Sequence, residues 1–301
     1  MAGGQERELR RRIKSVQSTR KITKAMELIA ASQIARAQSR IAANRPYRDG
    51  MVRIIREAAK ADPAAAGKLL GTPETLSHVV VLVIVGDRGL SGAYNSSVLR
   101  AAERLVASLK ADNKAVSVVA VGKKALNYFR FRGIDVTHSF LGFSDKPTFA
   151  DARDVAAATS SLFLDGTAEQ VLLVSMRFLS AATQSVEIRQ LLPIPEPESD
   201  EEPGAPSALE GYTEFEPEVQ DLLVDLAPVA LESEVFTALL EGSASFHTSQ
   251  QRAMAAATEN ADELVRSLTR VMNRARQDSI TTEIMEIVGG AEALRQEKEH
   301  A

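Results

Sequence analysis

The sequence contains few of the residues on which most enzyme chemistry depends. None of its 301 residues is cysteine or tryptophan, and four are histidine. Without cysteine the chain can form no disulfide, no thiolate metal site and no cysteine nucleophile. The four histidines fall in separate segments, and none has the spacing of a zinc motif. We therefore expect neither a catalytic centre nor a bound metal.

Long apolar runs are missing as well. The longest, at residues 79–86 and 155–164, are well short of the ~18 residues that a membrane-spanning helix needs. Hydrophobic residues make up 45% of the chain and charged residues 25%, which is typical of a globular protein. At roughly 150 residues per domain, the sequence predicts about two domains. Because its apolar runs are short, we expect no direct insertion into a membrane.

A glycine-rich turn follows the first predicted strand and could suggest a nucleotide site. Its glycines lie at positions 86, 89 and 92, which is not the G-x-G-x-x-G spacing of dinucleotide-binding domains. The pair Gly122-Lys123 lacks the glycine that a phosphate-binding loop has five residues earlier, where this chain has Ser117. We expect no cofactor. A Rossmann-like oxidoreductase remains a rival hypothesis, which nucleotide binding by the isolated chain would support.

Charge is distributed unevenly along the chain. Residues 1–60 contain 15 basic and 5 acidic side chains, a net charge of +10, whereas residues 190–251 contain fourteen acidic side chains and no Lys or Arg. Such segregation favours large charged partners over a small substrate. Solvated helix faces and an acidic loop would give the same pattern. A nucleic-acid or anionic-membrane binder is a second rival, which steeply salt-dependent binding would reveal.

Both ends of the chain are predicted to be long helices. Residues 5–60 are rich in good helix formers, and their apolar side chains repeat with a period near 3.5. Read with a one-residue shift after Val16, the stripe consists of Leu9, Ile13, Val16, Ile22, Met26, Ile29, Ile34, Ala37 and Ile41. Pro46 should kink or end this helix unless it lies in the first turn of a new one.

The carboxyl-terminal segment repeats the pattern from about residue 218 to residue 296, with a disturbance expected at Pro228. Its stripe consists of Met254, Ala257, Ala261, Leu264, Leu268, Val271 and Ala275, then shifts to Ile280, Ile284, Ile287, Ala291 and Leu294. Two narrow stripes at opposite ends of a chain bury most simply against each other. We predict an antiparallel coiled coil of the long N- and C-terminal helices.

The central segment is predicted to be an α/β domain. The expected strands are residues 79–85, 116–121, 134–140, 170–176 and 185–192, and the expected helices are residues 96–110, 123–132 and 148–164. Strands that alternate with helices predict a Rossmann-like domain with a mainly parallel sheet, in which residues 185–192 form an antiparallel edge.

These patterns divide the chain into six segments. They are an N-terminal helix (1–60), a linker (61–76), the α/β domain (77–192), an acidic proline-rich loop (193–214), a C-terminal helix (215–296) and a tail (297–301).

Three motifs resemble one known family. Arg12-Ile-Lys-Ser-Val16 leads into Lys21-Ile-Thr-Lys-Ala-Met-Glu-Leu-Ile-Ala-Ala-Ser32 in the first helix. Gly86-Asp-Arg-Gly-Leu-Ser-Gly-Ala-Tyr-Asn95 lies in the centre, and Ala275-Arg-Gln-Asp-Ser-Ile-Thr-Thr-Glu-Ile-Met-Glu-Ile-Val-Gly-Gly-Ala291 lies near the end. In order and content they resemble the γ subunits of bacterial F-type ATP synthases, with Ser91 where many members have Cys.

The resemblance implies a non-catalytic central-stalk rotor subunit. One copy would transmit torque between the membrane c ring and the catalytic hexamer of α and β subunits, coupling proton flow to ATP synthesis or hydrolysis. It would also contact the ε subunit, would bind no nucleic acid, and would lie peripherally on the cytoplasmic face of the cell membrane.

The resemblance also implies contact residues. The shaft residues that would meet the hexamer are Lys21, Lys24, Met26, Arg276, Gln277, Thr281 and Glu283. Phe215 and Glu216 would belong to a foot near the c ring and the ε subunit. The end of the second helix is apolar on several faces, which predicts burial against another protein. The residues of this apolar tip are Ile280, Ile284, Ile287 and Val288.

Overall fold

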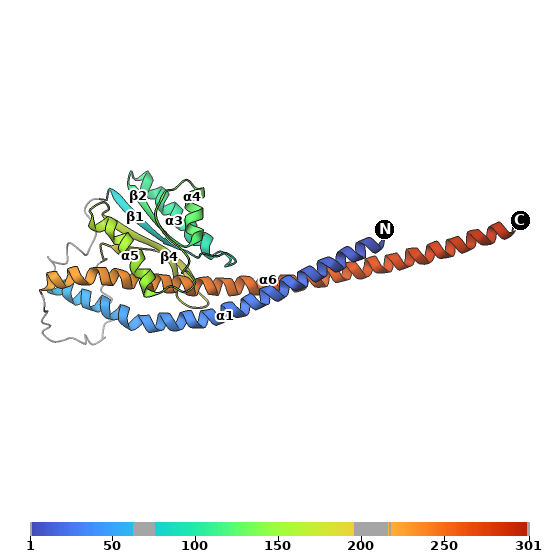
Figure 1. Cartoon of the computed structure of the whole chain (residues 1–301), viewed down its shortest axis with the longest axis horizontal. Coiled ribbons are helices and arrows are strands. Elements are labelled where there is room, and N and C mark those ends of the chain that lie inside the picture. The colour runs from blue at the N-terminus through green and yellow to red at the C-terminus, as the bar shows by residue number, and fades with distance from the viewer. Residues whose placement is uncertain (1, 63–75, 196–215, 217, 300–301) are drawn as a thin grey trace. The chain divides into compact units, whose positions relative to one another are not determined.

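The computed structural model describes residues 2–62, 76–195, 216 and 218–299 (Figure 1). The chain forms two compact units. We call residues 1–29 with residues 251–301 the helical-pair unit, and residues 30–250 the sheet unit. Both long helices, α1 (Ala2–Ala61) and α6 (Val219–Glu299), contribute to each unit.

Helix α1 passes through Pro46 without ending, and α6 passes through Pro228. Of the two effects expected at Pro46, a kink or an end, the structure excludes the end, and the helix predicted for residues 1–60 is continuous. Proline removes one backbone hydrogen bond and costs about 3 kcal/mol inside a helix. Contacts with α6 on both sides of Pro46 offset this cost, because Asn44 Nδ2 donates to Thr237 Oγ1 at 2.9 Å and Arg48 Nε donates to Glu234 Oε1 at 2.8 Å.

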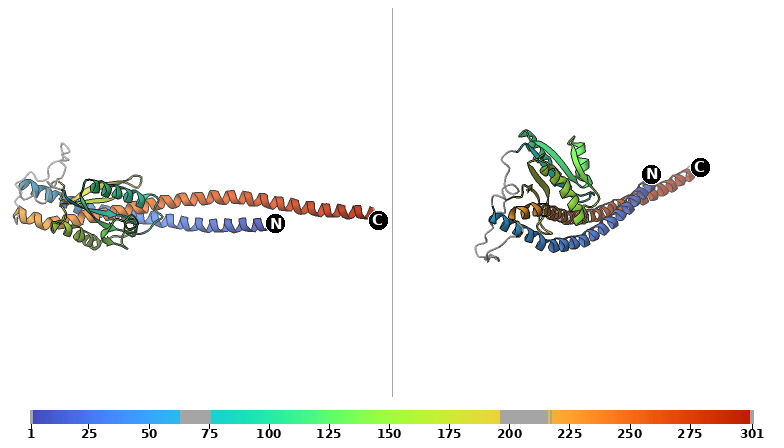
Figure 2. Two further views of the ribbon diagram at one scale, coloured as in Figure 1. Left: turned by 90° about the horizontal axis from the view of Figure 1, so that it is seen from above. Right: turned by 60° about the vertical axis from the view of Figure 1, so that its left-hand side comes forward.

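The helices of the helical-pair unit run antiparallel, as predicted. Arg20 pairs with Asp262 at 2.5 Å, and the hydroxyls of Thr23 and Thr258 lie 2.8 Å apart, so residue numbers rise on α1 as they fall on α6. Both views in Figure 2 show these two helical segments side by side. The helical segments of the sheet unit are antiparallel as well, since Asn44 contacts Thr237 and Arg48 contacts Glu234.

The buried stripe of α1 has no shift after Val16, contrary to the prediction. Ile22 and Ile29 are 61% and 60% exposed, whereas Thr23 is half-buried and Ala30 is fully buried. The alternating spacing of three and four residues continues along α1, but some of its positions, such as Thr23, are polar. Because the predicted stripe was made of apolar residues alone, it left these positions out and showed an apparent shift.

The stripe of α6 was also predicted in the wrong phase. Leu264 and Val271 are 47% and 48% exposed, so they do not belong to the seam. The less exposed positions are instead Met254, Thr258, Ala261, Val265, Leu268, Met272 and Ala275. The predicted and observed stripes share every seventh residue, and Thr258 decides between them because its hydroxyl faces Thr23.

The threonine pair should favour the observed register. Replacing either Thr23 or Thr258 with valine leaves one hydroxyl without its side-chain partner, and we expect a loss of about 1 kcal/mol. Replacing both should cost less than the sum of the single changes, because the contact between the two hydroxyls can be lost only once; each hydroxyl also has a carbonyl partner in its own helix, Arg20 O at 3.0 Å and Met254 O at 2.8 Å. Amide hydrogen exchange across residues 20–27 and 254–262 would measure these changes, and strictly additive losses would contradict the coupling.

The sheet unit contains five strands in the order β3-β2-β1-β4-β5. Their bounds are β1 His78–Ile84, β2 Ala115–Val121, β3 Val136–Phe140, β4 Gln170–Phe178 and β5 Gln184–Leu192. The first four are parallel to their neighbours, and β5 is antiparallel to β4. This arrangement confirms the mainly parallel sheet with an antiparallel edge. Strand β3 begins two residues later than predicted.

Three shorter helices and α6 cover the sheet. They are α3 (Tyr94–Ala111), α4 (Lys123–Phe131) and α5 (Phe149–Leu164). Odd-numbered residues of β1 pack with α3 and α4, and even-numbered residues pack with α5 and α6. A capping box starts α5, in which Asp151 N donates to Thr148 Oγ1 at 3.2 Å and Thr148 N donates to Asp151 Oδ2 at 2.6 Å.

Candidate functional site

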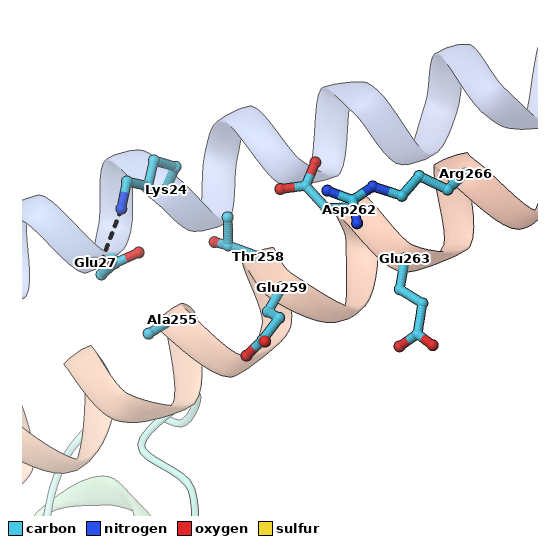
Figure 3. A pocket seen from close by; sticks show the side chains of 8 residues that line it. All are labelled: Lys24, Glu27, Ala255, Thr258, Glu259, Asp262, Glu263 and Arg266. Atoms are coloured by element: carbon cyan, nitrogen blue, oxygen red, sulfur yellow. Dashed lines mark hydrogen bonds and ion pairs between the residues drawn. The ribbon is translucent and has the colours of Figure 1, made fainter.

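The helical-pair unit carries a polar groove. The cavity measures about 540 Å³ and is lined by Lys24, Glu27, Ala255, Thr258, Glu259, Asp262, Glu263 and Arg266. Lys24 Nζ lies 2.9 Å from Glu27 Oε1 (Figure 3), so the lysine is paired within its own helix. Figure 3 shows Glu263 pointing away from α1. The groove presents both signs of charge to a partner.

Predicted contact residues on α1 lie beside this groove. Lys21 and Lys24 are exposed, and Met26 is half-buried. The three residues lie within two turns of α1. The two lysines are exposed to solvent, and Met26 lies close to the seam. A partner surface that packs here would meet two ammonium groups and the edge of one thioether.

The predicted contact residues on α6 form a second group. Arg276 lies 18 residues beyond Thr258, which faces Thr23, or about 27 Å along the helix at 1.5 Å per residue. All four side chains, Arg276, Gln277, Thr281 and Glu283, are exposed. Glu283 accepts a hydrogen bond from Ser279 at 3.5 Å. The structure therefore does not bring the two predicted groups together, and each is available to a separate contact.

The apolar tip is exposed throughout. Ile280, Ile284, Ile287 and Val288 have 47%, 53%, 72% and 58% of their surface exposed, and Met285 has 68%. No described segment of the chain covers these large aliphatic side chains. Together they form an exposed surface that favours contact with another protein. Of the two foot residues, Glu216 is exposed, and Phe215 lies outside the described residues.

Sequence reasoning missed the residues that organise the glycine-rich loop. Asp87 Oδ1 accepts a hydrogen bond from Lys123 N at 2.9 Å, and Asp87 Oδ2 accepts from Gly142 N at 3.0 Å and from Ser144 Oγ at 2.8 Å. Burial alone would raise the pKa of Asp87, but these hydrogen bonds outweigh it and lower the pKa below its ordinary value. The signal in the sequence was an acid immediately after a buried strand.

Asn95 closes the same loop from the first turn of α3. Its Oδ1 accepts from Gly86 N at 2.9 Å, and its Nδ2 donates to Arg88 O at 3.0 Å and to Ser91 Oγ at 3.2 Å. Two amides of the glycine-rich motif are thus satisfied within the fold, Gly86 N by Asn95 and Asp87 N by Ser144 Oγ at 2.8 Å. Those amides are the groups that would otherwise face a phosphate.

The backbone requires glycine at position 122 for a reason that is unrelated to phosphate binding. Its φ of +96° and its close approach to β1 both require glycine, because an added Cβ would lie 2.2 Å from Val85 O. Lys124 N then donates to Gly86 O at 3.2 Å. The Gly122-Lys123 pair joins the ends of two neighbouring strands.

Helix α6 occupies the space over the glycine-rich loop. The Phe246 ring is 1% exposed and packs edge to face on Tyr94, with ring centroids 5.7 Å apart. A Cβ on Gly86 would lie 3.0 Å from Phe246 Cδ2. In dinucleotide-binding domains a ligand lies at this carboxyl edge of the strands. Here the Phe246 side chain packs at that edge.

His247 follows Phe246 and is also buried. Its Nε2 lies 3.4 Å from Asp145 O. Burial is the largest cause that lowers the pKa of His247, to about 4; a hydrogen bond with Gln250 opposes the shift, and the charges of Arg88 and Lys146 add to it. The imidazole is therefore neutral in the folded protein at neutral pH.

We expect His247 to make the sheet unit sensitive to acid. As pH falls from about 6.5 to about 4, the unfolded chain gains a proton here that the folded chain does not accept, so stability is lost in that window. The expected loss is about 3 kcal/mol. Urea unfolding at several pH values should show that the free energy of unfolding depends less on pH in His247→Gln than in the unchanged protein. His138→Gln is the control, because His138 is exposed, and equal slopes in all three proteins would contradict the assignment.

Metal and membrane sites are not found in the described parts of the chain. Within residues 2–62, 76–195, 216 and 218–299, no three His, Asp or Glu residues come together as metal ligands. No helix in the same ranges combines the length and hydropathy of a bilayer-spanning segment.

Comparison with known proteins identifies the family. The family model described as ATP synthase matches residues 5–294. The ATP synthase gamma chain of Parafrankia sp. (strain EAN1pec) is 46% identical over 295 residues, covering 97% of this chain and 98% of the relative. That of Clavibacter michiganensis subsp. michiganensis is 42% identical, covering 98% of this chain and 100% of the relative.

Solved structures agree in fold. A chain from the central stalk and c ring of the Tetrahymena thermophila mitochondrial ATP synthase is 26% identical with a TM-score of 0.60, covering 78% of this chain and 99% of that one. A chain from the OSCP, F1 and c-ring structure of the Euglena gracilis mitochondrial ATP synthase has a TM-score of 0.66 at 18% identity, covering 98% and 96%. The chain belongs to the family of ATP synthase gamma chains.

Proposed function

We propose that the chain is the central-stalk rotor subunit of a bacterial F-type ATP synthase. It transmits torque between the membrane c ring and the catalytic hexamer of α and β subunits, and so couples proton flow to ATP synthesis or hydrolysis. The observation that carries this proposal is the family match over residues 5–294, together with a helical pair whose outer side chains remain exposed.

The helical pair suits the transmission of torque. An antiparallel pair resists bending better than one helix, and its seam holds polar contacts such as Thr23 with Thr258 that oppose sliding of one helix along the other. The exposed Lys21, Arg276 and Glu283 offer charged contacts to the hexamer without deep apolar interdigitation. Contacts of this kind can form and break as the shaft turns.

The chain itself would be non-catalytic. Asn95 accepts a hydrogen bond from Gly86 N in the glycine-rich loop, and Phe246 occupies the space where a nucleotide would lie. Catalysis would belong to the β subunits, and this subunit would bias the conformation of their nucleotide sites in turn. These features also disfavour the oxidoreductase alternative.

Assembly and location follow from the same proposal. One copy would occupy the centre of the hexamer, and the sheet unit would contact the ε subunit and the c ring. Phe215 and Glu216 would lie in the foot near both partners. The subunit would lie at the periphery of the membrane, on the cytoplasmic face of the bacterial cell membrane.

The absence of cysteine provides a clean test. A single Lys24→Cys variant, in a complex whose only other cysteine is placed on the facing β-subunit surface, should form one cross-link between rotor and hexamer. ATP-driven turnover should fall at least tenfold on oxidation and recover on reduction, because a locked rotor cannot pass from one catalytic site to the next. Leu179→Cys, on an exposed turn of the sheet unit, is the matched control. Full turnover with the cross-link intact would refute the rotor role.

A further inference from the structure

A cavity of about 530 Å³ lies within the sheet unit, between α1, β5 and α6. Small-molecule sites typically measure about 300 to 1,000 Å³. One part of its wall is aliphatic, where Met51 and Ile55 of α1 face Leu231 of α6, all three buried. Val52, which is 37% exposed, also belongs to the lining.

The remaining wall contains three buried polar atoms that have no hydrogen-bond partner. They are Arg56 Nε, Arg189 Nε and Ser233 Oγ. Ser233 is 1% exposed, so water at the protein surface does not satisfy its hydroxyl. Buried donors are normally paired, and three unpaired donors around one cavity indicate that a ligand supplies the acceptors.

The nearest carboxylate in the wall is already neutralised. Glu234 Oε1 accepts from Arg48 Nε at 2.8 Å, and Glu234 Oε2 lies 3.1 Å from Arg189 Nη1. Both of its oxygens are therefore engaged. Burial raises the pKa of Glu241 above its ordinary value, and the charges of Arg189 and Arg48 oppose that shift.

Arg56 supplies the uncompensated charge. No carboxylate in the described part of the chain forms an ion pair with it, whereas Glu187, the other acid of the wall, pairs with Arg177 at 3.3 Å. Of the three arginines in the wall, Arg48 and Arg189 share Glu234, and Arg56 is left without an ion-pair partner in the described part of the chain. A single anionic group would balance it.

We propose that this cavity binds a single-chain anionic amphiphile. Its head, a carboxylate or a phosphate monoester, accepts hydrogen bonds from Arg56, Arg189 and Ser233, and its alkyl chain lies along Met51 and Leu231. The combination of apolar wall and unpaired donors selects against simple anions, which leave the aliphatic wall uncovered, and against cationic amphiphiles, which meet the guanidinium of Arg56.

Isothermal titration of the full-length chain with decanoate, below its micellar concentration, tests the proposal. We expect a single site with a Kd of about 10 to 100 µM. Decyl phosphate should bind with similar affinity, and decylamine and inorganic phosphate should bind at least tenfold more weakly. The Arg56→Gln variant should lose at least tenfold in decanoate affinity. Arg53→Gln is the matched control, because Arg53 is exposed on the same helix and is absent from the cavity wall.

Two further variants separate the possible outcomes. Ser233→Ala removes one head-group donor without changing a charge and should weaken decanoate binding several-fold, which keeps the test available if Arg56→Gln unfolds. In a second variant Glu196 and Glu198, which follow the cavity residue Pro195 in the sequence, become glutamine. Binding that appears only in this variant would mean that the chain's own acids take the place of the ligand, and would overturn the proposal. Absent binding, or equal affinity of Arg56→Gln and Arg53→Gln, would overturn it as well.

Discussion

Replacing Phe246 with alanine should lower the free energy of unfolding of the sheet unit by about 4 kcal/mol. The side chain is 1% exposed, packs edge to face on Tyr94, and reaches the backbone of the glycine-rich loop at Gly86. Its removal leaves a cavity among groups that are fixed by backbone hydrogen bonds and cannot collapse inward. A loss of this size corresponds to a fall of about 10 °C in the melting temperature.

Differential scanning calorimetry of the full-length chain would measure this change. Phe246→Leu is the matched control, and it should cost much less because it refills most of the volume. Phe131→Ala is a second control, since Phe131 is 85% exposed and should leave stability within about 0.5 kcal/mol. A melting temperature unchanged in Phe246→Ala would show that the contact between α6 and the loop contributes little to the fold.

The sheet unit was the part of the fold most accessible from sequence. Continuous β-branched runs such as residues 79–85 belong to strands that are buried on both faces, and their alternation with helices indicates parallel pairing. The limits of strands were harder to predict. Asp135 and Ile134 precede β3 rather than belonging to it, and Ile134 N donates to Phe129 O at 2.9 Å, at the end of α4, instead of to a strand.

The seams of the long helices could be predicted only in part. Their period was clear, but their phase depends on which polar residues the partner helix can satisfy. Thr258 is buried and Thr23 half-buried in the seam, where their hydroxyls meet, whereas Ile22 and Leu264 remain exposed. A single sequence does not show this pairing, since the two threonines are separated by more than two hundred positions.

The organisation of the glycine-rich loop was also out of reach of sequence. Its glycines suggested a ligand, but the group that fills the space is Phe246, from a helix at the far end of the chain. Asp87, to which the sequence alone assigned no role, connects the glycine-rich loop with the loop after β3 through Gly142 and Ser144. Long-range contacts of this kind decide between a binding loop and a packed one.

Truncation after Ser279 should leave the sheet unit folded and strongly reduce rotor function. The removed segment includes the apolar tip, whose aliphatic side chains are 47% to 72% exposed in the isolated chain. Burying the exposed half of each against a collar of partner subunits would contribute about 1 kcal/mol per side chain. Without the tip we expect weaker retention of the subunit in the complex, and at least a several-fold loss of delivered torque.

The measurement is ATP-driven rotation and coupled proton pumping in assembled complexes that carry the truncated chain. Truncation after Ala291 is the matched control, because it shortens the helix and keeps Ile280, Ile284 and Ile287 in place. Thermal unfolding of the isolated chains should show the same transition for the sheet unit in both truncated forms. If rotation and pumping match the intact complex after truncation at Ser279, the apolar tip has no mechanical role, and its exposed aliphatic surface must serve a contact outside the motor.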